Sequence, residues 1–118
     1  MSYDGWIELP IPGQDEAHTL AEIGNYTSNV SPMWRWCMSL VTEQPMRLSD
    51  TDGWTCDRVA PVLAKAVAVM EAERHRLEEM SPANGWGDYD GALRYLRTTA
   101  ELAEKFASVP GSYIRWWV

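Results

Sequence analysis

Two stretches of the sequence repeat apolar residues at the spacing of an α-helix. In residues 55–80 the repeat is interrupted once, by Glu73, and its apolar members are Val59, Leu63, Ala66, Met70 and Leu77. In residues 88–109 the members are Tyr89, Leu93, Leu96, Ala100, Ala103 and Ala107. Side chains three or four residues apart share one face of a helix, because a turn takes about 3.6 residues. The pattern predicts two helices packed antiparallel, as a hairpin around a shared interior.

Capping and turn residues mark the ends of these helices. Thr55 can cap the first helix, while Pro61 either sets its start near residue 60 or bends it. Residues 81–87, which contain an Asn-Gly pair, are predicted to form a loop that ends the first helix. Asp88 is a suitable N-cap for the next helix. The Pro-Gly pair at 110–111 ends that second helix after residue 109.

A third helix is predicted over residues 31–43. Ser31 is a good N-cap, and Pro32 occupies the first helical position, where its missing N–H is not needed. Strand-forming residues near 5–9 and 112–117 suggest a small β element formed by the two ends of the chain.

These elements together predict a mainly α fold. The antiparallel helical hairpin and the third helix form its body, residues 112–118 supply a terminal strand, and residues 1–30 are an acidic extended arm or loop. A chain of 118 residues has the length of one domain, so residues 1–118 are expected to share one core.

The charge is acidic and unevenly distributed. Lys and Arg total 10 against 17 Asp and Glu, a net charge of −7, which argues against general affinity for nucleic acid or anionic lipid. All charged side chains in residues 1–30 are acidic, which favours a basic protein surface as the partner of this arm. No apolar run reaches membrane-spanning length and no signal region opens the sequence, so we expect a soluble protein of the cytoplasm.

Tryptophan is unusually frequent. The sequence has seven Trp but one Phe, and the Trp positions are 6, 34, 36, 54, 86, 116 and 117. Large rings can fill a thin core, or they can serve a binding surface, because an indole places an apolar body beside a polar N–H. Composition leaves both interpretations open for each Trp.

No catalytic residue, metal site or cofactor is predicted. His18, His75, Cys37 and Cys56 lack the spacing of metal ligands, and two Cys do not make a disulfide scaffold. Cys56 lies near a predicted helix N-terminus, where the dipole lowers a thiol pKa. His75 is almost 30 Å farther along a continuous helix at about 1.5 Å per residue, which excludes a Cys56–His75 dyad. A buried, inert thiol is the favoured interpretation. No glycine-rich phosphate loop is present.

A candidate binding site comes from two polar segments. Residues 25–36 are denser in hydrogen-bonding side chains than a linker needs, and residues 84–88 combine glycines with a helix start. The candidate residues are Asn25, Tyr26, Thr27, Asn29, Trp34, Arg35, Asn84, Trp86 and Asp88. One interpretation is that the polar side chains satisfy the backbone of a buried loop. The other is a pocket in which Trp34 or Trp36 stacks on a planar ligand and Arg35 holds an anionic or carbonyl group.

The same two segments resemble known sequences. Residues 25–34 read NYTSNVSPMW and residues 82–89 read PANGWGDY. These strings, within residues 22–109, are similar to a group of small uncharacterised proteins of tailed bacteriophages and prophages, especially those of actinobacteria. The resemblance implies a viral product made in the bacterial cytoplasm, and it brings no activity and no catalytic residue.

The leading hypothesis is a non-catalytic phage accessory protein, of a host-takeover or anti-defence type, that binds a host protein or captures a host ligand. One alternative is a small metal-dependent enzyme that uses loop carboxylates such as Asp50, Asp52, Asp88 and Asp90. Another is a structural role, as a homo-oligomer in which Trp116 and Trp117 are buried against a second copy.

Overall fold

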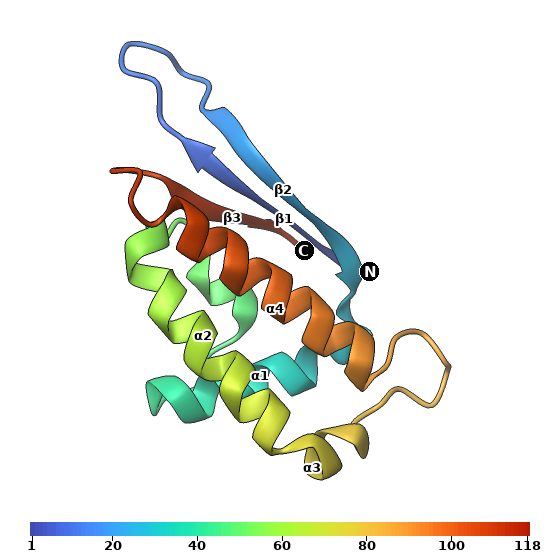
Figure 1. The fold of residues 1–118 in the computed structure, drawn as a ribbon. Helices are drawn as coiled ribbons and strands as arrows, with labels where there is room; N and C mark the ends of the chain where they lie inside the picture. Colours follow the sequence, from blue (N-terminus) through green and yellow to red (C-terminus); the bar gives the residue numbers. More distant parts are fainter.

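A three-stranded antiparallel sheet lies against a layer of helices in the computed structural model, which describes residues 1–118 (Figure 1). The elements are β1 (Ser2–Leu9), β2 (His18–Thr27), α1 (Ser31–Thr42), α2 (Cys56–Ala72), α3 (Arg74–Glu78), α4 (Tyr89–Phe106) and β3 (Tyr113–Trp117). Two short 3-10 turns, η1 (Ser28–Val30) and η2 (Leu48–Thr51), join them. The chain is 50% helical and 20% strand. The fold is therefore α+β, and the prediction of a mainly α fold with a minor β element is wrong.

The main error lies in residues 1–30. They form a β-hairpin of β1 and β2 rather than an extended arm, and β3 pairs with the other side of β1, so the strand order is β2-β1-β3. The register of β1 against β2 shifts twice, leaving Leu20 and Ile23 of β2 without a partner residue. Each such bulge interrupts the period of two by which a strand is recognised in a sequence, so the alternation in β2 is too weak to detect.

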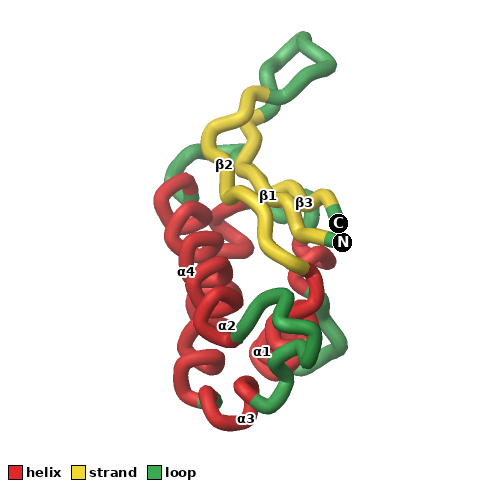
Figure 2. The backbone as a smooth tube through the Cα atoms, turned by 90° about the vertical axis from the view of Figure 1, so that its right-hand side faces the viewer, coloured by secondary structure: helices red, strands yellow, loops and turns green.

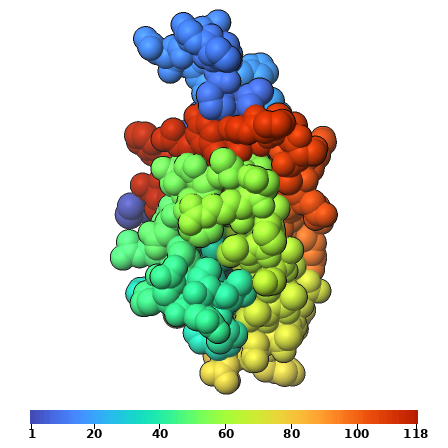
Figure 3. Space-filling view, turned by 90° about the vertical axis from the view of Figure 1, so that its left-hand side faces the viewer, coloured from blue at the N-terminus to red at the C-terminus, as the bar shows by residue number.

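The hairpin extends beyond the rest of the molecule. Its turn, between Leu9 and His18, stands clear of the helices and of β3 (Figure 3). Asp15 and Glu16 lie in this turn with exposed side chains. These two of the N-terminal acidic residues thus project beyond the body of the molecule.

The two apolar stripes are buried where α2 and α4 pack together. Every stripe residue of these helices is buried except Ala107, which is half-buried just beyond α4. The helix predicted over 55–80 is not continuous, because the backbone leaves helical geometry at Glu73 (φ −107°, ψ 32°) before α3 begins. The helix predicted over 88–109 ends at Phe106, and the one over 31–43 ends at Thr42. None of the helices has the length and apolarity needed to cross a membrane.

Aromatic rings join the sheet to the helices. The Tyr3 ring on β1 meets Trp34 of α1 edge-on at 5.0 Å between ring centroids, and it meets Trp116 of β3 at 5.5 Å. Trp34 in turn lies 5.4 Å from Tyr95 of α4. Trp116 also covers Gly5 so closely that a Cβ at that position would collide with the indole. We call Tyr3, Trp34, Tyr95 and Trp116 the aromatic interface.

Three polar groups of the aromatic interface have hydrogen-bond partners in the core. The Trp34 indole donates to the carbonyl of Ala92 at 3.0 Å, and the Tyr95 hydroxyl donates to the carbonyl of Gly24 at 2.7 Å. The Trp116 indole donates to the buried Thr51 hydroxyl at 3.0 Å. Satisfied polar groups allow large rings to be buried without a desolvation penalty.

The C-terminal strand belongs to this core. Ile114 and Trp116 are buried, and the Ile114 backbone exchanges hydrogen bonds with Gly53 (2.8 Å) and Trp54 (2.9 Å) along its outer edge. The hypothesis that Trp116 and Trp117 are together buried against a second copy is therefore wrong for Trp116, which is used inside its own chain. Trp117 alone remains 73% exposed.

The adjacent pair offers a matched test of this assignment. We expect Trp116→Ala to lower the free energy of unfolding by about 3–5 kcal/mol, since it removes a large buried ring and the hydrogen bond that the indole donates to the Thr51 hydroxyl. Trp117→Ala should change it by less than about 0.5 kcal/mol. Urea denaturation followed by circular dichroism measures both, and equal losses would contradict the assignment.

Candidate functional site

A groove of about 710 Å³ opens where the end of β2 meets the loop between α3 and α4. Its lining residues are Met1, Ser2, Asn25, Tyr26, Thr27, Asn29, Asn84, Trp86 and Gly87. Six of the nine candidate residues from the sequence lie here, namely Asn25, Tyr26, Thr27, Asn29, Asn84 and Trp86. We call this feature the amide groove. Two segments about 60 residues apart in the chain therefore form one concave surface.

Close packing holds the two walls of the amide groove together. The Tyr26 hydroxyl accepts a hydrogen bond from the Asp88 N–H at 3.3 Å. A Cβ at Gly91 would collide with that same hydroxyl, and Gly87, at φ +90°, lies equally close to Thr27. Only glycine fits at these two positions, so the loop and the helix start can rest directly on the end of β2.

The lining can donate, accept and stack. It contains three amide side chains and no Asp, Glu, Lys, Arg or His side chain. The side-chain oxygen of Asn84 (Oδ1) accepts a hydrogen bond from the backbone N–H of Trp86 at 3.0 Å. The side-chain nitrogen of Asn84 is left free to donate to a ligand. The Trp86 ring is 68% exposed. The side chains of the groove therefore offer a ligand neutral hydrogen-bonding groups and one exposed ring.

The other three candidate residues lie elsewhere. Trp34 is fully buried in the aromatic interface, and Arg35 lies exposed on α1, beside a separate recess next to Arg47. The Asp88 carboxylate caps α4 by accepting from the Gly91 N–H at 2.8 Å. The expected stacking of a ligand on Trp34 with Arg35 as its clamp is therefore not formed. Trp36, the other stacking candidate, does share a recess of about 260 Å³ with Arg35, but its half-buried ring lies beneath the guanidinium of Arg76, at 5.2 Å.

A second surface was missed in the sequence. Figure 2 shows the helices on one side of the sheet only, so the opposite side is uncovered. The register places three rows of side chains there, in the order β2, β1, β3: Asn25, Asp4, Trp117; Glu22, Trp6, Arg115; and Thr19, Glu8, Tyr113. We call these nine residues the outer sheet face. The alternation of residues 4, 6, 8 and of 113, 115, 117 with buried neighbours is the signal that could have revealed it.

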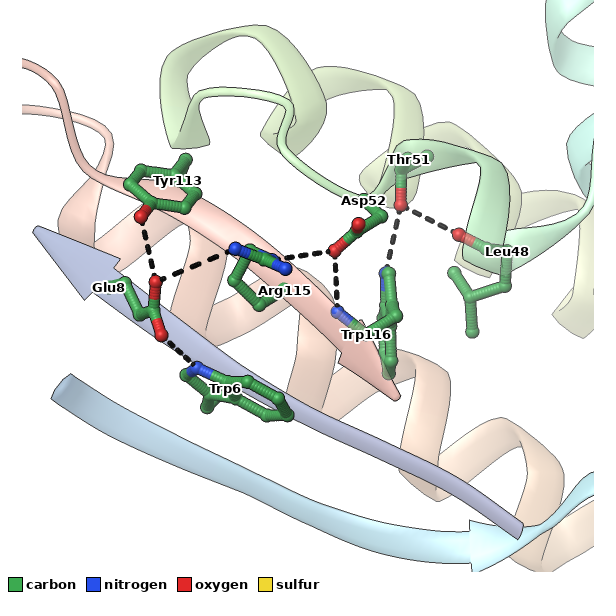
Figure 4. Close-up of polar contacts among 8 residues, drawn as sticks. All are labelled: Trp6, Glu8, Leu48, Thr51, Asp52, Tyr113, Arg115 and Trp116. Carbon is green, nitrogen blue, oxygen red and sulfur yellow. Dashed lines mark hydrogen bonds and ion pairs between the residues drawn. The ribbon is translucent and has the colours of Figure 1, made fainter. Parts of the chain in front are cut away.

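Hydrogen bonds fix the rings of the outer sheet face (Figure 4). Glu8 accepts from the Trp6 indole at 2.6 Å and from the Tyr113 hydroxyl at 2.7 Å. The hydrogen bond to Glu8 is the main reason that the pKa of the Tyr113 phenol is raised. Arg115 pairs with Glu8 at 4.0 Å and with Asp52 at 3.0 Å. The one cation of this face is thus already engaged by carboxylates.

The loop carboxylates of the enzyme hypothesis have structural partners. Asp50 accepts from the Arg47 N–H at 2.8 Å, Asp52 is bound to β3, and Asp90 pairs with Arg74 at 3.0 Å. No three His, Cys, Asp or Glu side chains are grouped closely enough to hold a metal ion. The geometry gives this hypothesis no assembled ligand set.

Neither cysteine has the surroundings of a nucleophile. Cys56 is the first residue of α2, but it is fully buried, and burial raises its pKa more than any other influence. Burial likewise raises the pKa of Cys37 from 9.0 to about 12. The expected lowering of the Cys56 pKa by the helix dipole is outweighed by desolvation.

Buried thiols predict a loss of stability in alkali. The unfolded Cys37 thiol ionises near pH 9 while the folded one stays protonated to about pH 12. Because the unfolded chain then binds fewer protons, the contribution of Cys37 to the free energy of unfolding should be constant below about pH 9 and fall as the pH rises toward 12. Urea denaturation at pH 7, 9, 10 and 11 measures this, and Cys37→Ala should make the decline smaller but not abolish it, because burial also raises the pKa of Cys56 and of Tyr95. A stability that rises over this range would contradict the burial of the thiols.

No protein-family model, curated protein or solved structure matches this chain. The two surfaces are therefore interpreted from their own residues, geometry and charge.

Proposed function

We propose that this chain is a non-catalytic binding protein that docks on a basic surface of another protein through its outer sheet face. The observation that carries the proposal is the uncovered face itself, on which aromatic rings alternate with carboxylates. A one-sided sheet of this kind exposes side chains that the fold does not bury, and exposed apolar patches rimmed by polar groups mark contacts.

The charge of the face selects the partner. The outer sheet face carries three carboxylates, those of Asp4, Glu8 and Glu22, and one cationic side chain, Arg115. Arg115 already pairs with Glu8 and with Asp52. The acidic turn of the hairpin continues the same ribbon. A second copy of this chain, or a nucleic acid, would bring like charges together, whereas a Lys- or Arg-rich surface is complementary and would be steered toward it.

The aromatic rings supply the anchors. Trp6 and Tyr113 are half-buried and held by Glu8, and Trp117 stands 73% exposed at the end of the row that begins with Asn25. Indole and phenol rings pack against the stem of a Lys or Arg side chain and attract its charge. Rings ordered before binding lose little conformational entropy in the complex.

The resemblance of residues 22–109 to small phage and prophage proteins extends the proposal to the biological setting. In that setting the partner is a basic protein of the bacterial host, bound in the cytoplasm during takeover of the cell or evasion of its defences.

Paired variants in a capture experiment test the proposal. The immobilised protein is exposed to a lysate of an actinobacterial host, and the retained proteins are identified by mass spectrometry. We expect basic proteins to be retained, and Trp117→Ser or Glu22→Lys to reduce their yield by about tenfold or more, as expected for interface anchors.

Matched controls separate docking from nonspecific charge attraction. Glu101→Lys makes the same charge change on an exposed position of α4, and Trp86→Ser removes an equally exposed indole in the amide groove. Both controls should retain the partner. Loss of the partner with Glu101→Lys, or retention of the partner by both Trp117→Ser and Glu22→Lys, would contradict the proposal.

A further inference from the structure

We propose that the amide groove binds an uncharged heterocyclic base, free or as its nucleoside. This inference does not depend on the outer sheet face, since Asn29, Asn84 and Trp86 lie off that face and Asn25, at the end of β2, is the one residue that the two surfaces share. The groove volume of about 710 Å³ leaves room for a nucleoside and falls within the usual range for small-molecule sites.

The amides match the edge of a base. Asn25, Asn29 and Asn84 lie on the lining with exposed side chains. The side-chain amides of Asn25 and Asn29 make no hydrogen bond within the protein, whereas Asn84 accepts one through its side-chain oxygen. Each such amide places a donor beside an acceptor. That pairing is complementary to the adjacent donor and acceptor on a heterocyclic base, as in asparagine contacts to adenine.

An aromatic ring is available to stack on the base. Trp86 lies between Gly85 (φ +77°) and Gly87 (φ +90°), and its indole is 68% exposed at the rim of the groove. No aromatic partner or cation covers this ring, in contrast to Trp36 beneath Arg76. A planar ligand can therefore lie against its face while the amides bind its edge.

The charge of the site excludes a phosphate group. No Lys, Arg or His side chain lines the groove, and Arg35, the expected anion clamp, lies at another recess. The carboxylate of Asp88 stands beside the Tyr26 wall, and the whole chain carries a net charge of −7. A phosphate would meet no cationic side chain there, the α-amino group of Met1 being the one basic group among the lining residues, and the net negative charge of the chain would oppose its approach.

The missing carboxylates also argue against a carbohydrate. Sugar hydroxyls donate most strongly to ionised acceptors, and the lining contains none. A base, which needs neutral donors and acceptors in equal measure, is the better match to three amides.

Isothermal titration with defined compounds tests the inference. The probes are adenosine, guanosine, cytidine and uridine, each compared with its 5′-monophosphate, and cellobiose as the carbohydrate. We expect at least one nucleoside to bind, and its monophosphate to bind at least about tenfold more weakly because no cationic side chain meets the phosphate. Saturation by no nucleoside at millimolar concentration, equal or tighter binding of the monophosphate, or binding of cellobiose alone would overturn the inference.

Variants locate the binding. Trp86→Ala and Asn29→Ala should each weaken nucleoside binding by about tenfold, with an unchanged melting temperature because both side chains are exposed. Trp117→Ala and Gln44→Ala remove an equally exposed indole and an exposed amide outside the groove, and they should bind as the parent does. Binding that survives both groove variants would also overturn the inference. Since Trp117 serves the proposed protein contact and Trp86 the groove, either proposal can fail while the other stands.

Discussion

Burial of aromatic rings between the sheet and the helices is the interaction on which the rest of this structure depends. A two-stranded hairpin such as that of β1 and β2 is marginal in water by itself, and its apolar inner face is stabilised by packing on another layer. Tyr3 supplies that contact from the central strand, with Trp34 and Tyr95 from two helices and Trp116 from β3. Each edge-on or tilted pair adds about 0.5–1.5 kcal/mol beyond the area that it buries. The same rings join the two ends of the chain, because β1 and β3 come from opposite termini.

One-sided packing explains how two recognition surfaces can coexist with this core. Burying one face of β1 leaves the opposite face, with Trp6 and Glu8, outside. The hydrogen bond from the Tyr95 hydroxyl to Gly24 anchors β2 on α4, next to the segment where Tyr26 meets the loop before that helix. The aromatic interface therefore positions the outer sheet face directly and the amide groove through β2.

The seven Trp residues divide according to this architecture. Trp34 and Trp116 are structural, with buried rings and satisfied indole nitrogens. Three more are half-buried and held by charged neighbours, namely Trp6 by Glu8, Trp36 by Arg76 and Trp54 by Arg58. Only Trp86 and Trp117 are largely exposed, and they lie on the two different surfaces. Composition alone could not make this division, because an indole suits a core and an interface equally well.

The sequence predicts what depends on local pattern. The helices containing Leu63, Leu93 and Cys37 follow from a period of 3.6 and from caps, and the polar segments around Asn25 and Asn84 meet in one groove. Features that depend on pairing between distant segments could not be predicted from the sequence. The bulges at Leu20 and Ile23 interrupt the alternation by which β2 could be recognised. Without β2 the outer sheet face could not be predicted, because the register of all three strands defines it. The predicted pocket with Trp34 and Arg35 does not form, because neighbours on a helix point about 100° apart, so that Trp34 faces the core and Arg35 faces solvent.

Hydrogen exchange of the indole N–H groups, resolved by NMR, tests the central claim most directly. If the aromatic interface holds the sheet on the helices, the Trp34 and Trp116 indole protons, bonded to Ala92 and Thr51, should exchange only through global unfolding. The protons of Trp86 and Trp117, which are exposed, should exchange at the rate of a free indole. Rapid exchange at Trp34 or Trp116, or strong protection at Trp86 in the absence of ligand, would contradict the account.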